Sequence, residues 1–84
     1  MSEKRKILIV DDEESFCRLV KLNLERTGKY LVSMEHTGTK ALGQARAFAP
    51  DLVLLDVILP DRDGFAVYRD IRSDSSLKDV PVIF

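Results

Sequence analysis

The sequence has little cysteine, few aromatic residues and no long apolar run. It contains one cysteine, one histidine and no tryptophan in 84 residues. A single cysteine cannot form a disulfide within the chain, which favours a reducing compartment over secretion. The longest apolar segments, such as residues 52–55, are far too short to cross a bilayer, and the charged start does not lead into a signal-peptide core. We therefore expect a soluble, cytoplasmic protein with no membrane partner.

An excess of charge of one sign is lacking as well. Thirteen basic residues oppose 14 acidic ones, and the formal net charge is −1. No field of the whole chain would attract nucleic acid, and the short basic segment at residues 4–6 has no aromatic or basic neighbours to extend it. The hydrophobic content of 45% is typical of a globular chain. We expect one folded unit over residues 1–84 that does not bind nucleic acid directly.

Short apolar runs alternate with helical repeats along the chain. Continuous apolar runs predict strands that are buried on both faces, and apolar residues three or four apart predict helices. The expected strands cover residues 7–10, 30–34 and 52–55, and a fourth begins within 80–84. The expected helices begin near Ser15, at an N-cap on Thr39, and near Phe65; the first has a core stripe of Phe16, Leu19, Val20 and Leu24. This βαβαβαβ order predicts an α/β fold, a doubly wound parallel sheet with helices on both faces.

Acidic residues follow the first and third expected strands. Asp11 and Asp12 come directly after residues 7–10, and Asp56 follows residues 52–55. Because polar chemistry gathers beyond the carboxyl ends of parallel strands, we expect the three carboxylates to meet. Like charges at close range destabilise a fold unless a cation or a proton intervenes. Hard oxygen ligands without histidine or cysteine favour Mg²⁺ over Zn²⁺, with Mn²⁺ as a substitute.

Two segments resemble the receiver domain of bacterial two-component response regulators. They are residues 7–13 (ILIVDDE) and 52–64 (LVLLDVILPDRDG), and residues 81–84 (PVIF) resemble the start of that family's fourth strand. The resemblance implies a flavodoxin-like (CheY-like) fold with five strand–helix units and strand order 2-1-3-4-5. Residues 1–84 would form the N-terminal two-thirds of a single receiver domain, an incomplete βαβαβαβ that ends before the family's switch Ser or Thr and its phosphate-binding Lys.

The resemblance also implies roles for individual residues. Asp56 matches the phosphoacceptor, which receives a phosphoryl group from a sensor histidine kinase or phosphotransfer protein in a Mg²⁺-dependent reaction. Such a domain catalyses its own phosphorylation and acts as a phosphorylation-controlled switch; it is not a conventional metabolic enzyme. The matched metal ligands are Asp11, Asp12, Asp56 and the backbone carbonyl of Ile58. Pro60 and Gly64 match the residues that shape the loop after the acceptor.

Other functions remain open on the residues alone. One alternative is a receiver-like interaction module that dimerises without phosphorylation, and an apolar fourth strand at the sheet edge predicts self-association by swapping or edge pairing. A haloacid-dehalogenase-type hydrolase would need a second acid where Ile58 stands. A flavodoxin-type cofactor site is disfavoured by the acidic first loop. His36 is expected at the surface, and Cys17 as a small packed thiol.

Overall fold

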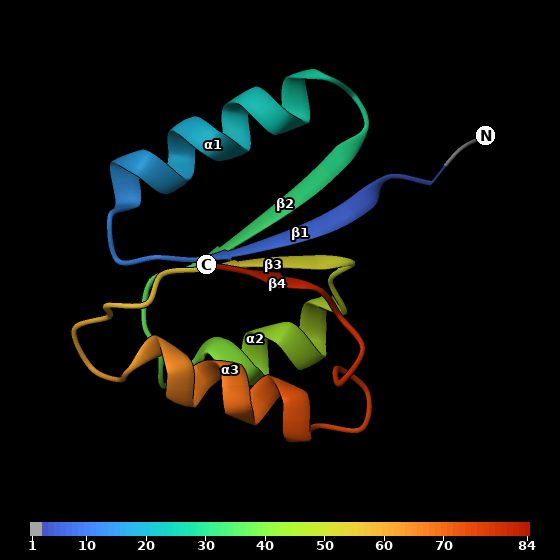
Figure 1. Cartoon of the computed structure of the whole chain (residues 1–84). Coiled ribbons are helices and arrows are strands. Elements are labelled where there is room, and N and C mark those ends of the chain that lie inside the picture. Colours follow the sequence, from blue (N-terminus) through green and yellow to red (C-terminus); the bar gives the residue numbers. More distant parts are fainter. Residues whose placement is uncertain (1–2) are drawn as a thin grey trace.

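The computed structural model describes residues 3–84 and contains four strands and three helices within them (Figure 1). None of these helices combines the length and the apolar character that a bilayer crossing requires. In chain order the elements are β1 (Arg5–Val10), α1 (Glu14–Arg26), β2 (Tyr30–Glu35), α2 (Ala41–Phe48), β3 (Leu52–Leu55), α3 (Gly64–Ser73) and β4 (Val82–Ile83).

The strands form one parallel sheet in the order β2-β1-β3-β4. Helix α1 covers one face, and α2 and α3 cover the other (Figure 1). This arrangement confirms the predicted doubly wound, flavodoxin-like fold, which is incomplete. In the register of the sheet, Val10 stands beside Glu35 of β2 and Leu55 of β3. The carboxyl ends of the three strands are therefore level, so the loops that follow them meet.

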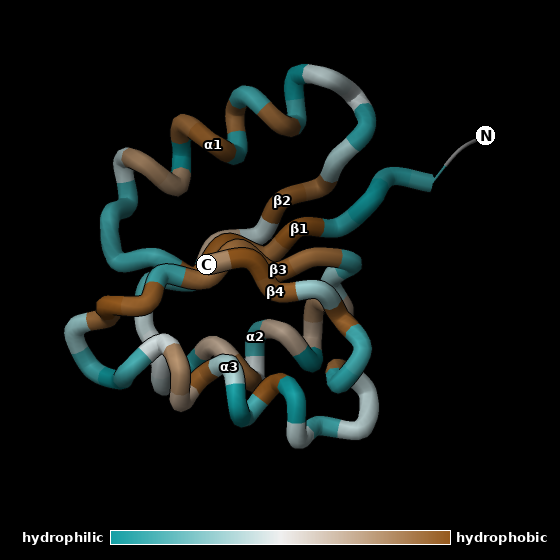
Figure 2. The backbone as a smooth tube through the Cα atoms, viewed as in Figure 1, coloured by the Kyte–Doolittle hydropathy of each residue, from teal (hydrophilic) through white to brown (hydrophobic). Residues whose placement is uncertain are grey.

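Each side of the sheet has its own core. Alternate residues of a strand point to opposite faces. Leu8 and Val10 accordingly join the larger cluster beneath α2 and α3, while Ile7 and Ile9 join a smaller cluster beneath α1. Apolar residues run along β1 and β3 in Figure 2, as expected for strands that are buried on both faces. The sheet thus holds its central strands firmly, which fixes where their carboxyl ends lie.

Several details of the helices and strands depart from the sequence-based expectations. Phe16 and Leu19 were expected in the core but are 49% and 58% exposed, because Cys17 faces the sheet in their place. Thr39 does not cap α2, whose N-cap is Lys40 without a side-chain hydrogen bond. The fourth strand is limited to two residues, and Pro81 precedes it, its carbonyl accepting from the Val53 N–H at 2.9 Å.

Candidate metal and phosphoacceptor site

Three carboxylates meet at the carboxyl ends of β1 and β3. Asp11, Asp12 and Asp56 each present an oxygen, and these atoms lie within 4.8 Å of one another. Asp11 and Asp56 are half-buried, and Asp12 is exposed. The structure thus brings together the acids that the sequence predicted to meet, although Asp56 is far from the other two along the chain. Topology causes this, because β1 and β3 are hydrogen-bonded neighbours.

The backbone fixes Asp56 at the end of β3. Its N–H donates to the carbonyl of Val10 at 2.9 Å, which extends the β1–β3 pairing by one residue. Its Oδ1 accepts from the Ile58 N–H at 3.2 Å. The carboxylate is thereby oriented by its own loop, and no donor among residues 3–84 hydrogen-bonds to Oδ2.

Gly64 lets α3 begin directly against the acceptor loop. A Cβ at this position would stand 2.4 Å from the Asp56 carbonyl oxygen and 2.7 Å from the Val57 Cα. The Gly64 N–H donates to the Val57 carbonyl at 2.8 Å, so the close approach is part of the loop's own bonding. Only glycine fits here without moving the backbone of the predicted acceptor.

Ile58 lies in a short loop hairpin between β3 and α3. Its backbone pairs with Asp63 in an isolated antiparallel bridge, while its side chain is exposed, the residue being 80% accessible. Asp63 then caps α3, because its side chain accepts from the Phe65 N–H at 2.9 Å. An exposed isoleucine side chain has no packing role here, which suits a position predicted to act through its carbonyl.

Asp61 is a structural residue that the sequence reasoning missed. Its two carboxylate oxygens accept from the Gly38 and Thr39 N–H groups at 2.8 and 2.9 Å. These bonds lower the pKa of Asp61 to about 2, and they tie the loop after β3 to the loop before α2. No local spacing could have revealed the contact, because its partners lie 23 and 22 residues away in the sequence.

The loop after β1 is also held by several bonds. The Asp11 N–H donates to the Glu35 carbonyl at 3.0 Å, and Asp11 Oδ1 accepts from the Glu13 N–H at 2.9 Å. The Asp11 carbonyl accepts from His36 Nδ1 at 2.9 Å and from the Cys17 thiol at 3.4 Å. Burial raises the pKa of Cys17 to about 11, with the negative charges of Asp11 and Asp12 adding to the effect. The thiol therefore keeps its proton near neutral pH.

These features define a class of protein. A doubly wound parallel sheet carries three carboxylates at the carboxyl ends of β1 and β3, where the chain continues to opposite faces of the sheet. This is the edge at which such folds bind their ligands. Carboxylate oxygens without histidine or cysteine are a donor set that suits Mg²⁺.

The family follows from comparison with known proteins. The model of the response regulator receiver domain matches residues 7–84. The chain belongs to this family, whose domains receive the signal in two-component systems and interact with histidine kinases or phosphotransfer proteins.

Individual relatives agree with this assignment. The chain is 48% identical over 68 residues to the alkaline phosphatase synthesis transcriptional regulatory protein PhoP of Bacillus subtilis, a match that covers 81% of this chain and 28% of that protein. The chemotaxis response regulator CheY4 of Vibrio cholerae superposes with a TM-score of 0.88 at 30% identity, covering 95% of this chain and 66% of that one. The chain thus spans less than a third of that curated relative.

A third relative bears on the metal. The receiver domain of the sensor histidine kinase PA1611 from Pseudomonas aeruginosa has a TM-score of 0.85 at 29% identity, covering 95% of this chain and 65% of that one. That structure is described with a magnesium ion coordinated in its active-site cleft.

Proposed function

We propose that Asp56 accepts a phosphoryl group from a phosphohistidine of a sensor histidine kinase or phosphotransfer protein, and that the phosphorylated chain acts as a switch. The observation that carries the proposal is the meeting of Asp11, Asp12 and Asp56 within 4.8 Å at the ends of two neighbouring strands. A carboxylate at such a site can act as a nucleophile when its neighbours manage the charge. The assignment of the chain to the receiver family supports the same reaction.

The reaction would be a displacement at phosphorus. A carboxylate oxygen of Asp56 attacks, an O–P bond forms, the N–P bond of the phosphohistidine breaks, and the imidazole nitrogen takes up a proton. Because Oδ1 accepts from the Ile58 N–H, Oδ2 is the oxygen that we assign as the nucleophile. The backbone thus orients the acceptor before the donor arrives, and positioning is, with electrostatic stabilisation, what a protein contributes to phosphoryl transfer.

The three carboxylates of Asp11, Asp12 and Asp56, together with the Ile58 carbonyl, are the groups that would hold Mg²⁺ or Mn²⁺. The ion would offset negative charge on the carboxylates and on the incoming phosphoryl group. The magnesium ion described in the related PA1611 receiver domain supports this assignment. Asp12 is exposed, whereas the carboxylates of Asp11 and Asp56 each accept a hydrogen bond from a backbone N–H of their own loop.

The test is incubation with Mg²⁺ and a small phosphodonor such as acetyl phosphate, followed by intact-mass measurement. We expect the mass to increase by one phosphoryl group. This increase should not occur when a chelator is added before the phosphodonor, nor in Asp56→Asn. Asp51→Asn, at the opposite end of β3, is the matched control and should still be phosphorylated. An adduct that persists in Asp56→Asn would refute the assignment of the acceptor.

We also propose that the chain self-associates through β4, because the two edges of the sheet are protected differently. At the β2 edge both backbone groups of Val32 are occupied: its N–H donates to Glu25 at 2.9 Å, and Lys21 donates to its carbonyl at 2.9 Å. At the other edge Ile83 and Phe84 are 53% and 54% exposed. An exposed apolar edge strand is a template for pairing with a second copy.

Light scattering during size-exclusion chromatography tests this proposal. We expect the chain to form dimers or larger species that Ile83→Lys reduces to monomers. The matched control is Leu31→Lys, which places the same charge at an exposed position of the protected β2 edge. A monomeric wild-type chain, or equal effects of the two substitutions, would contradict pairing through β4.

A further inference from the structure

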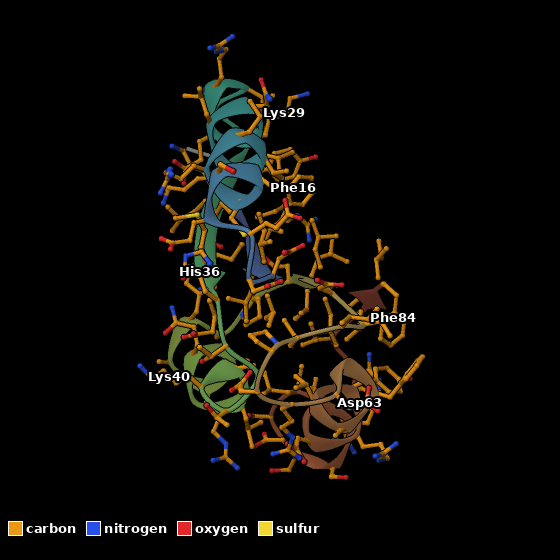
Figure 3. The ribbon with its side chains drawn as sticks, turned by 90° about the vertical axis from the view of Figure 1, so that its left-hand side faces the viewer. Phe16, Lys29, His36, Lys40, Asp63 and Phe84 are labelled. Atoms are coloured by element: carbon orange, nitrogen blue, oxygen red, sulfur yellow. The ribbon has the colours of Figure 1, made fainter. Side chains whose placement is uncertain are left out.

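One backbone carbonyl near the acidic site receives two side-chain donors from different elements. The Asp11 carbonyl accepts from His36 Nδ1, at the end of β2, and from Cys17 Sγ, on the buried side of α1. Figure 3 shows His36 between the start of α1 and the segment that leads to α2. Neither residue takes part in the reaction proposed above, and the resemblance to the receiver family assigned neither a role.

The bonded carbonyl belongs to the peptide that joins Asp11 to Asp12. Rotation of this peptide would turn the two carboxylates relative to each other, because each is attached to one of its ends. The Asp11 N–H is already held by the Glu35 carbonyl at 3.0 Å. Because the Asp11 carbonyl is held as well, the peptide before the Asp11 Cα and the peptide after it both have a fixed orientation.

His36 is itself firmly placed. The Glu35 carboxylate accepts from the His36 N–H at 3.0 Å and from the Thr37 N–H at 3.1 Å, so the backbone that carries the imidazole is fixed. A carbonyl only accepts, and therefore Nδ1 carries the ring proton in this arrangement. The other ring nitrogen, Nε2, lies 4.0 Å from the carboxylate of Glu14 at the start of α1.

We infer that His36 and Cys17 are positioning residues for the metal ligands: together they hold the Asp11–Asp12 peptide in the orientation that points both carboxylates toward Asp56. This inference rests on the proposed function. Groups that orient metal ligands typically change metal affinity by about 10–100-fold when they are removed, although they do not touch the ion. His36, with the shorter bond, contributes more than Cys17.

The experiment measures Mg²⁺ dissociation constants by calorimetric titration of the protein. His36→Leu removes the donor, and His36→Asn restores it, because the asparagine amide nitrogen occupies the place of Nδ1. We expect His36→Leu to bind Mg²⁺ about tenfold more weakly or worse, with His36→Asn recovering most of the affinity. Cys17→Ala should show a smaller loss that Cys17→Ser reverses.

A matched variant separates positioning from stability. Gln44→Met removes a comparable side-chain bond, from Gln44 to the Ser33 hydroxyl at 2.7 Å, away from the acids. It should lower the melting temperature in chelator without altering Mg²⁺ affinity. Unchanged affinity in His36→Leu, or an equal loss in His36→Asn, overturns the inference.

Two further readouts distinguish this inference from the proposed function. Nitrogen-detected NMR of the metal-free protein should show the Nδ1–H tautomer of His36, and the Nε2–H tautomer would overturn the inference by itself. If the wild-type protein does not bind Mg²⁺, the proposed function and this inference both fail. Suppose instead that the wild-type protein binds Mg²⁺ and Asp12→Ala does not. If His36→Leu then binds Mg²⁺ with the wild-type affinity, the positioning role is refuted and the proposed function is not.

Discussion

The two faces of the sheet are covered to different degrees. Beneath α2 and α3, ten buried residues form one cluster that includes Leu8, Val53 and Ile71. Beneath α1, the buried cluster has four members: Ile7, Ile9, Cys17 and Val32. Helix α1 also leaves Phe16, Leu19 and Leu22 about half exposed, whereas α3 leaves only Phe65 so exposed among its large apolar residues.

The better-covered face is also fastened at its loops. Asp61 ties the loop after β3 to the start of α2, and Arg46 of α2 forms an ion pair with Asp74 at the end of α3. Helix α1 is joined to the sheet edge by Lys21 and Glu25, which bond the backbone of Val32. The difference teaches that a continuous apolar strand can have a dense core on one face and a thin one on the other.

The largest expected effect is the loss of stability when a core residue of β1 is truncated. Two neighbouring residues of β1, which point to opposite faces of the sheet, allow the two cores to be compared. Leu8 is 0% exposed in the larger cluster and Ile9 is 1% exposed in the smaller one. Leu8→Ala should lower the free energy of unfolding by about 2–5 kcal/mol, and Ile9→Ala by an amount near the lower end, because its surroundings can collapse more easily. Urea unfolding measures both. An equal or larger loss for Ile9→Ala would remove the distinction between the faces.

Much of the fold could be predicted from local patterns. The run Leu52–Leu55 is a strand within the same bounds, and the alternation of strands and helices predicted the parallel order. The exposure of Phe16 and Leu19 could not be predicted, because helical spacing shows which residues share a face but not how far the sheet extends beneath it.

The candidate site also has a part that could be predicted from the sequence and a part that could not. The meeting of Asp11, Asp12 and Asp56 follows from topology, so strand order was enough to predict it. The Asp61 contacts and the bond from His36 to the Asp11 carbonyl depend on how loops pack, and each joins residues more than 20 positions apart. Neither has a local sequence signal.

A smaller effect concerns the loop contact on the better-covered face. The Gly38 and Thr39 N–H groups lower the pKa of Asp61 from 3.8 to about 2 in the folded chain. A lowered pKa contributes stability that is fully present above pH 3.8 and is lost as the pH falls toward 2. Asp61→Asn should therefore lower the urea midpoint at neutral pH, and its difference from wild type should shrink across that acidic window.

The exposed Asp79 provides the control for the removal of a carboxylate charge. Asp79→Asn should lower the urea midpoint at neutral pH by less than Asp61→Asn does. A difference for Asp61→Asn that is constant down to pH 2, or that grows as the pH falls, would show that the carboxylate does not fasten these loops.

The smallest expected effect lies on α1. Leu19 is 58% exposed, while Leu24 on the same helix packs against the smaller cluster. Leu19→Ser should change the free energy of unfolding by no more than about 0.5 kcal/mol, as is usual for surface positions, and Leu24→Ser should cost clearly more because it removes apolar contacts with the sheet. Urea unfolding of both variants decides the matter. If Leu19→Ser destabilised the chain as much as Leu24→Ser, the outer side of α1 would be a covered surface in solution, and the contrast between the two faces of the sheet would disappear.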